Sequence, residues 1–150
     1  MRINTDPAGP AYRVFQSSFV QATQDTTPDG NQVVFASTGR LMAARLDGSQ
    51  PPVVLVDDTS RFLSPMYDTD FSSDSQTLVY RNQGLFRVPL TGLRPPRQLD
   101  APDLDNFGRA DWFRVLSGRR GVLFLARPDD EAPYELFLGV LDRAVRGASR

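Results

Sequence analysis

Short runs of apolar residues alternate with turn-forming segments along the chain, and the spacing of these runs is regular. The run VVF at 33–35 returns as LVY at 78–80, 45 positions later, and as VLF at 122–124, after a further 44. Each run has the length and residue types of a strand, with Gly, Pro, Asp or Ser nearby. A repeat of this length, built from short strands, is typical of β-propeller blades. The pattern predicts an all-β chain, a partial β-propeller of about three four-stranded antiparallel blades.

The first two copies of the repeat follow one plan of four strands, in blades at 18–57 and 66–100. We expect strands at 18–23, 32–36, 40–45 and 53–56 in the first copy, and at 66–71, 77–81, 85–88 and 97–99 in the second. Residues that favour turns lie between these strands. In the first copy, for example, Pro28 fixes φ and Gly30 allows a positive φ. Pro95 and Pro96 cannot donate to a strand ladder, so the outer strand of the second copy should be a short edge.

The third copy, at 111–142, is degenerate. Strands are expected at 111–116, 121–126 and 134–141, with a longer polar hairpin loop at 128–133 and no evident outer strand. Tyr12 to Phe15, near the start of the chain, is a spare strand that would serve for closure. A closed propeller needs about four blades or more. Therefore either this single module at 1–150 is a piece of a longer propeller, or a homodimer joined head to tail completes a six-bladed ring.

The composition removes most enzyme classes. The 150 residues contain no His, Cys or Lys, so the chain has no imidazole base, thiolate, Schiff-base lysine or usual zinc site. The net charge is −1 and the arginines are scattered, which argues against nucleic acid as a partner. No apolar run approaches a membrane span, and the start of the chain lacks the pattern of a signal peptide. We therefore expect a protein that is not an enzyme and needs no cofactor or metal.

Several acidic residues could in principle bind a metal ion or take part in catalysis, so their positions were compared with known metal-binding and turn patterns. Asp29 and Asp74 recur at equivalent turns, where aspartate usually caps backbone N–H groups. Asp103, Asp105 and Asn106 have oxygen ligands at alternating positions, but the segment lacks the Gly and distal Glu of an EF-hand loop, so no metal site is predicted there.

A pair of carboxylates lies on the expected inner strand of the second copy. Asp68 and Asp70 alternate there and would line a central channel on one face. Paired carboxylates can hydrolyse glycosides, but the sequence favours a solvated channel.

The densest polar and aromatic cluster lies at the entry to the third copy. It consists of Arg109, Asp111, Trp112 and Arg114, and Trp112 is the only tryptophan. The corresponding approach to the second copy carries Arg61, Phe62 and Tyr67. Loops that enter inner strands open on one face of a propeller, and Trp and Arg are favoured at binding hot spots. These seven residues are the predicted binding site for a protein or peptide, although a lone Trp also packs readily between blades.

The repeat resembles that of TolB-type β-propellers. Segments FSSDS at 71–75 and TTPDG at 26–30 match the turn of that repeat, and LFRVPLTG at 85–92 matches its third strand and following turn. The resemblance covers about 18–142; it is good in two copies and poor in the third, where Gly118 replaces the turn aspartate. The repeat also resembles that in the propeller domains of dipeptidyl-peptidase and prolyl-oligopeptidase relatives.

The resemblance implies a non-catalytic scaffold that binds protein or peptide at a bacterial envelope, in the periplasm or at the cell surface. Two alternatives imply catalysis: the gating propeller of a peptidase system, or a propeller glycosidase that uses Asp68 or Asp70. A partial gene product without an independent role is the fourth interpretation.

Overall fold

The computed structural model describes residues 20–37, 39–57, 68–82, 84–99, 112–118, 121–127, 131 and 133–141, with the backbone alone for 20–24. The described part is all-β and consists of three antiparallel sheets. It contains no helix with the length and hydrophobicity needed to cross a membrane.

The first two sheets have four strands each, in sequence order. The first sheet contains β1 (Val20–Thr26), β2 (Gln32–Ser37), β3 (Arg40–Arg45) and β4 (Val53–Asp57). The second sheet contains β5 (Thr69–Phe71), β6 (Thr77–Arg81), β7 (Leu85–Pro89) and β8 (Arg97–Gln98). The third sheet, ordered β11-β10-β9, contains β9 (Trp112–Val115), β10 (Gly121–Ala126) and β11 (Glu135–Val140).

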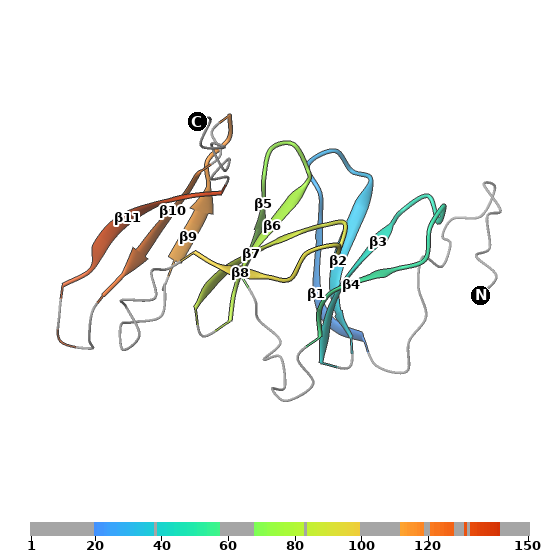
Figure 1. Ribbon diagram of the computed structural model, residues 1–150, viewed down its shortest axis with the longest axis horizontal. Coiled ribbons are helices and arrows are strands. Elements are labelled where there is room, and N and C mark those ends of the chain that lie inside the picture. Colours follow the sequence, from blue (N-terminus) through green and yellow to red (C-terminus); the bar gives the residue numbers. More distant parts are fainter. Residues whose placement is uncertain are drawn as a thin grey trace, which may run out of the picture.

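The three sheets stand in a row, with the second between the other two (Figure 1). Strand β6 shows why the row holds together, because successive side chains of a strand point to opposite faces. Leu78 and Tyr80 belong to the apolar core shared with the first sheet, and Val79 belongs to the core shared with the third. Leu78 and Val79 are completely buried. The middle sheet is therefore closed on both faces.

The inner strands of neighbouring sheets are tied by two carboxylates at equivalent positions. Asp25 accepts a hydrogen bond at Oδ2 from the Thr69 hydroxyl, at 3.4 Å, which links β1 to β5. Asp70 accepts one at Oδ2 from the Val115 backbone N–H, at 2.8 Å, which links β5 to β9. Each carboxylate also accepts from the N–H of the next residue through Oδ1. Strands β1, β5 and β9 therefore lie side by side along one edge of the row.

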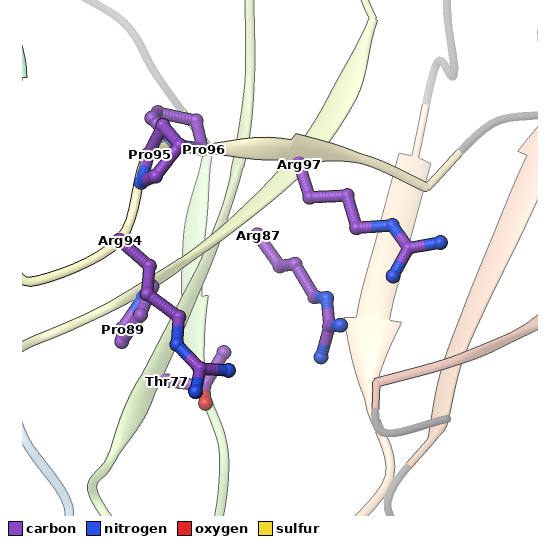
Figure 2. A pocket seen from close by; sticks show the side chains of 7 residues that line it. All are labelled: Thr77, Arg87, Pro89, Arg94, Pro95, Pro96 and Arg97. Atoms are coloured by element: carbon purple, nitrogen blue, oxygen red, sulfur yellow. The ribbon is translucent and has the colours of Figure 1, made fainter. Parts of the chain in front are cut away.

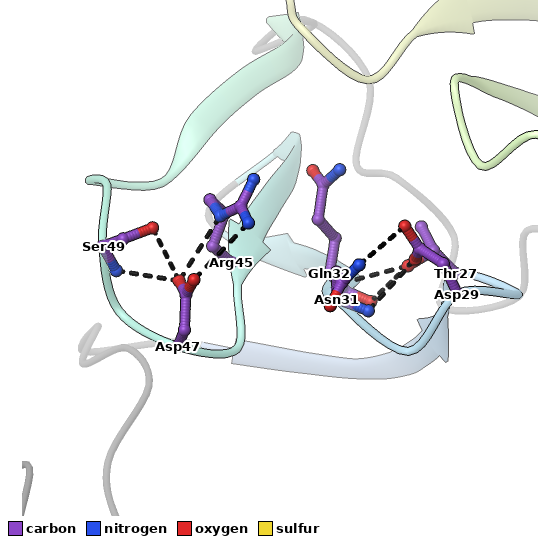
Figure 3. Close-up of polar contacts among 7 residues, drawn as sticks. All are labelled: Thr27, Asp29, Asn31, Gln32, Arg45, Asp47 and Ser49. Atoms are coloured by element: carbon purple, nitrogen blue, oxygen red, sulfur yellow. Dashed lines mark hydrogen bonds and ion pairs between the residues drawn. The ribbon is translucent and has the colours of Figure 1, made fainter.

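The hairpin turn between the first two strands is built alike in the first and second sheets. In the first sheet, the Thr27 hydroxyl donates to Asp29 at 2.6 Å and accepts from the Gln32 N–H at 3.0 Å (Figure 3). In the second sheet, Ser72 donates to Asp74 at 2.6 Å and accepts from the Thr77 N–H at 2.9 Å. One hydroxyl therefore closes each turn, because it can donate and accept together.

The corresponding turn of the third sheet lacks both polar groups. Its backbone closure is kept, since the Leu116 N–H donates to the Gly121 carbonyl at 2.9 Å. Leu116 stands where the other turns have a hydroxyl, and Gly118, with a φ of 73°, stands where they have aspartate. The positive φ also falls one position earlier than at Gly30 and Ser75. Among the described residues of this turn, Leu116 and Gly118 therefore replace the hydroxyl and the aspartate of the other two turns.

The observed fold confirms the predicted all-β class and three antiparallel sheets. The short outer strand expected near Pro95 and Pro96 is confirmed, because β8 has only two residues. One prediction was wrong in detail. Strand β1 runs to Thr26, since it contains a bulge between Gln21 and Gln24 that carries the pairing into the segment expected to be a turn. The third sheet has three strands among the described residues, in agreement with a third copy that has no evident outer strand.

The described sheets form an open row, without ring closure. The spare strand predicted at Tyr12 to Phe15 lies outside the described residues.

Candidate functional site

A cavity of about 400 Å³ lies where the inner strands β5 and β9 run side by side. Its lining brings together four residues singled out from the sequence, Asp68, Asp70, Trp112 and Arg114, together with Thr69 and Phe113. The two segments are brought together because the Asp70 carboxylate accepts the Val115 N–H across the gap between the sheets. The cavity thus combines acidic, basic and aromatic side chains at the inner edge of the row.

The two carboxylates of this cavity, Asp68 and Asp70, have different interaction partners. Asp68 forms an ion pair with Arg81, with Oδ2 at 2.7 Å from Nη2, and its side chain is more than half exposed. Both oxygens of Asp70 accept backbone N–H groups, from Phe71 and Val115. Asp70 therefore connects two sheets, while Asp68 is the carboxylate that remains open to solvent.

Trp112 and Arg114 belong to the face of the third sheet that points away from the second sheet. Their neighbours Phe113 and Val115 point into the shared core, so the alternating residues lie on the opposite face. Trp112 is 44% exposed, and Arg114 is exposed as well. Trp112 is therefore not part of the core between the second and third sheets, and it borders the cavity beside β5 with nearly half of its surface exposed.

The same face continues across the third sheet and is apolar. Strand register places Leu125 opposite both Trp112 and Leu136, and Leu123 opposite both Arg114 and Leu138. Leu136, Leu138 and Val140 are 61%, 64% and 56% exposed. We call these seven residues the open face: Trp112, Arg114, Leu123, Leu125, Leu136, Leu138 and Val140. Exposed apolar surface of this kind is typical of interaction surfaces.

The far face of the first sheet is less exposed than the open face. Phe35 and Ala44 lie on the side away from the second sheet and are buried, while Val54 on the same side is 38% exposed. In the described part of the chain, the more exposed end of the row is therefore the third sheet.

The turn aspartates Asp29 and Asp47 accept several hydrogen bonds within their own turns. Asp29 accepts hydrogen bonds from the Thr27 hydroxyl and from the backbone and side chain of Asn31. These bonds lower the pKa of Asp29 from 3.8 to about 2, with the Thr27 hydroxyl contributing most. The pKa of Asp47 is also lowered to about 2, first by the Ser49 hydroxyl and backbone N–H and then by Arg45. Figure 3 shows both networks.

The remaining predicted residues are not placed by the structure. Arg61, Phe62, Tyr67, Arg109 and Asp111 lie outside the described residues. Asp103, Asp105 and Asn106, for which no metal site was predicted, lie outside them as well. Within the described ranges, no group of three or more acidic side chains is gathered as a metal ligand set.

A second cavity, of about 520 Å³, was not anticipated from the sequence. Three arginines line it, namely Arg87, Arg94 and Arg97, together with Thr77 and three prolines (Figure 2). A comparison of the first two repeats would have revealed them. The segment QPPV at 50–53 returns as RPPR at 94–97, 44 positions later, with arginines at both ends.

No family model, curated protein or solved structure matches this chain. Function is therefore argued from the geometry above.

Proposed function

We propose that the chain is a run of three β-propeller blades that acts as a non-catalytic scaffold and binds protein through the open face. The stacking of the sheets supports this reading, since each sheet repeats the plan of the one before and joins it through its inner strand. The resemblance to TolB-type propellers points in the same direction.

The observation that carries the proposal is the exposure of the open face. In the first two sheets, the corresponding face is buried against the next sheet: Leu41 packs toward the second sheet and Leu85 toward the third. In the third sheet, leucines and a valine on that face are more than half exposed. Burying such a side chain contributes about 1.5–3 kcal/mol. A partner with a complementary apolar sheet would therefore bind here.

A second copy of this chain is the partner we propose. Three blades are too few for a closed propeller, and two chains together supply six. A head-to-tail ring would place the open face of one copy against the first sheet of the other. Because Phe35 and Ala44 are already buried, that ring requires the first sheet to uncover them. A two-fold contact between two open faces needs no such change and covers both open faces, although it does not close a ring.

The test is the solution mass of the chain by light scattering over a dilution series. We expect twice 16.7 kDa at high concentration and 16.7 kDa for Leu138→Asp, which places a charge in the centre of the open face. Leu93→Asp is the matched control, because Leu93 is 85% exposed in a loop away from that face; this variant should remain dimeric. A wild-type chain that stays monomeric at every concentration would refute the second copy as partner.

A further inference from the structure

The inner strands of the first two sheets each carry a carboxylate that reaches the next sheet, and the third sheet carries an arginine at the same position. Asp25 accepts from the Thr69 hydroxyl, and Asp70 accepts from the Val115 N–H. Steps of 45 and then 44 positions, as for the apolar triplets, lead from Asp25 to Asp70 and on to Arg114. Strand pairing gives the same alignment, because each of the three lies opposite the middle residue of its sheet's triplet. On the open face, an acceptor has therefore been replaced by a cationic donor.

This replacement disfavours a head-to-tail ring of two copies. In such a ring, strand β1 of the second copy would take the place beside β9 that β9 takes beside β5. The residue of β1 equivalent to Val115 is Thr26, whose N–H already donates to Asp25. A guanidinium group only donates hydrogen bonds, as does a backbone N–H. Arg114 would therefore meet a donor where the repeat requires an acceptor.

The open face is arranged in two rows that run across the third sheet, each with one residue from β9, β10 and β11. Strand register gives the rows as Trp112, Leu125 and Leu136, and as Arg114, Leu123 and Leu138. The two rows are about 6.4–6.8 Å apart, because residues i and i+2 of a strand share a face. One row therefore begins with an aromatic ring on β9 and the other with a guanidinium group.

We propose that two copies of the chain join open face to open face, about a two-fold axis that runs between these rows and perpendicular to the strands. The inference rests on the proposed function, because it takes the second copy as the partner. In a two-fold interface, if residue i contacts j, then j contacts i. This axis places Trp112 of each copy over Arg114 of the other, and leucine over leucine in the remaining positions. A guanidinium group over a tryptophan ring is a favourable cation–π contact.

Other positions of the axis suit Arg114 less well. An axis parallel to the strands, along β10, would place Arg114 over Leu138 of the other copy, and covering a cation with an apolar side chain is costly. An axis along the row of Arg114 would place the two arginines over each other. An axis along the row of Trp112 would stack the two tryptophans and leave Arg114 without an aromatic ring. Only the axis between the rows matches the chemistry of both rows.

The small size of this contact determines its strength. The two rows and Val140 supply far fewer residues than the about 20–30 on each side of a standard stable interface. We therefore expect a dimer that forms and dissociates with protein concentration, rather than a permanent one.

The experiment compares Trp112→Glu with Trp112→Arg, two changes at one exposed position that differ in the sign of the charge. In the proposed register, this position lies over Arg114 of the other copy, so the glutamate variant gains two ion pairs per dimer and the arginine variant gains two repulsions. We expect the dissociation constant of the Trp112→Glu dimer, from sedimentation equilibrium of the full chain, to be at least about tenfold lower. The double variant Trp112→Arg/Arg114→Glu should restore the tighter dimer, and circular dichroism checks that each variant folds.

A matched variant on the first sheet distinguishes the two-fold contact from the ring. Val54 is 38% exposed on the face that the ring would cover and the two-fold contact would not. We expect Val54→Asp to leave the dissociation constant unchanged, and a lost dimer would overturn the proposal in favour of the ring.

The remaining outcomes separate this inference from the proposed function. If the wild type dimerises but Trp112→Glu and Trp112→Arg have equal dissociation constants, or both lose the dimer, or Trp112→Arg dimerises more tightly, the register is wrong and the second copy is still the partner. A wild type that stays monomeric at every concentration would refute both.

Discussion

The second and third sheets are built from the same repeat but have different surroundings. The second sheet is buried on both faces, with Leu78 and Val79 of one strand completely inaccessible on opposite sides. The third sheet is buried on one face only, and alternate residues of β11 are exposed leucines and a valine. An internal repeat is stable because its neighbours cover it. The comparison shows that the open face of the third sheet carries apolar residues of the kind that are buried in the second sheet, although no other sheet of the described chain packs against it.

The largest expected effect comes from truncating one buried leucine and one exposed leucine. Leu78→Ala removes a completely buried side chain from the core between the first two sheets and should cost about 2–5 kcal/mol of unfolding free energy. Leu138→Ala, on the open face, should change it by less than about 0.5 kcal/mol in dilute solution. Urea denaturation followed by circular dichroism measures both. Equal losses for the two variants would contradict the difference between the sheets.

The next effect tests the contact between the first and second sheets. A Cβ at Gly92 would lie 2.3 Å from Val53 Cγ1, and its φ is +66°. Gly30 has a similar φ of +70° but nothing within 4 Å of a Cβ. Both alanine variants suffer the backbone strain, which costs about 1–2 kcal/mol. Only Gly92→Ala also overpacks the contact between the sheets.

We therefore expect Gly92→Ala to destabilise the chain by about 1–3 kcal/mol more than Gly30→Ala in paired urea denaturations. If the two variants unfold at the same urea concentration, the first and second sheets do not pack as described.

The smallest effect concerns the turns. The pKa of Asp29 is about 2 in the folded chain, below the ordinary value of 3.8 for an aspartate, so ionisation of this carboxyl stabilises the folded state. This contribution is complete above about pH 4–5 and is lost as the pH falls through about 2. NMR titration of the side-chain carboxyl carbon should give a midpoint near 2 for Asp29. Thr27→Val removes the strongest hydrogen bond and should move the midpoint toward 3.8, whereas an unchanged midpoint would contradict this origin of the shift.

The sequence predicted the strands well where local patterns decide them. The apolar triplets and the turn residues gave the second and third strands of each copy nearly residue by residue, because alternation and Gly or Pro act locally. It predicted the end of β1 wrongly, because a bulge is set by pairing with β2 rather than by the strand's own residues.

The candidate site was predicted in part for a similar reason. Trp112, Arg114, Asp68 and Asp70 were singled out separately, but their meeting at one cavity depends on how β5 and β9 lie together. The arginine cavity was missed because the opposition of Arg87 and Arg97 depends on the register between β7 and β8. The open face was missed because exposure depends on what the neighbouring sheet covers.

The central claim is that the third sheet has an open face that a neighbour covers, whereas the second sheet is closed within the chain. Amide hydrogen exchange at low and high protein concentration tests it most directly. We expect the amides of β6 to exchange slowly at both concentrations, and those of β11 to exchange rapidly in dilute solution and more slowly in concentrated solution. If β11 is as protected as β6 at the lowest concentration, or if its exchange does not depend on concentration, the claim is wrong.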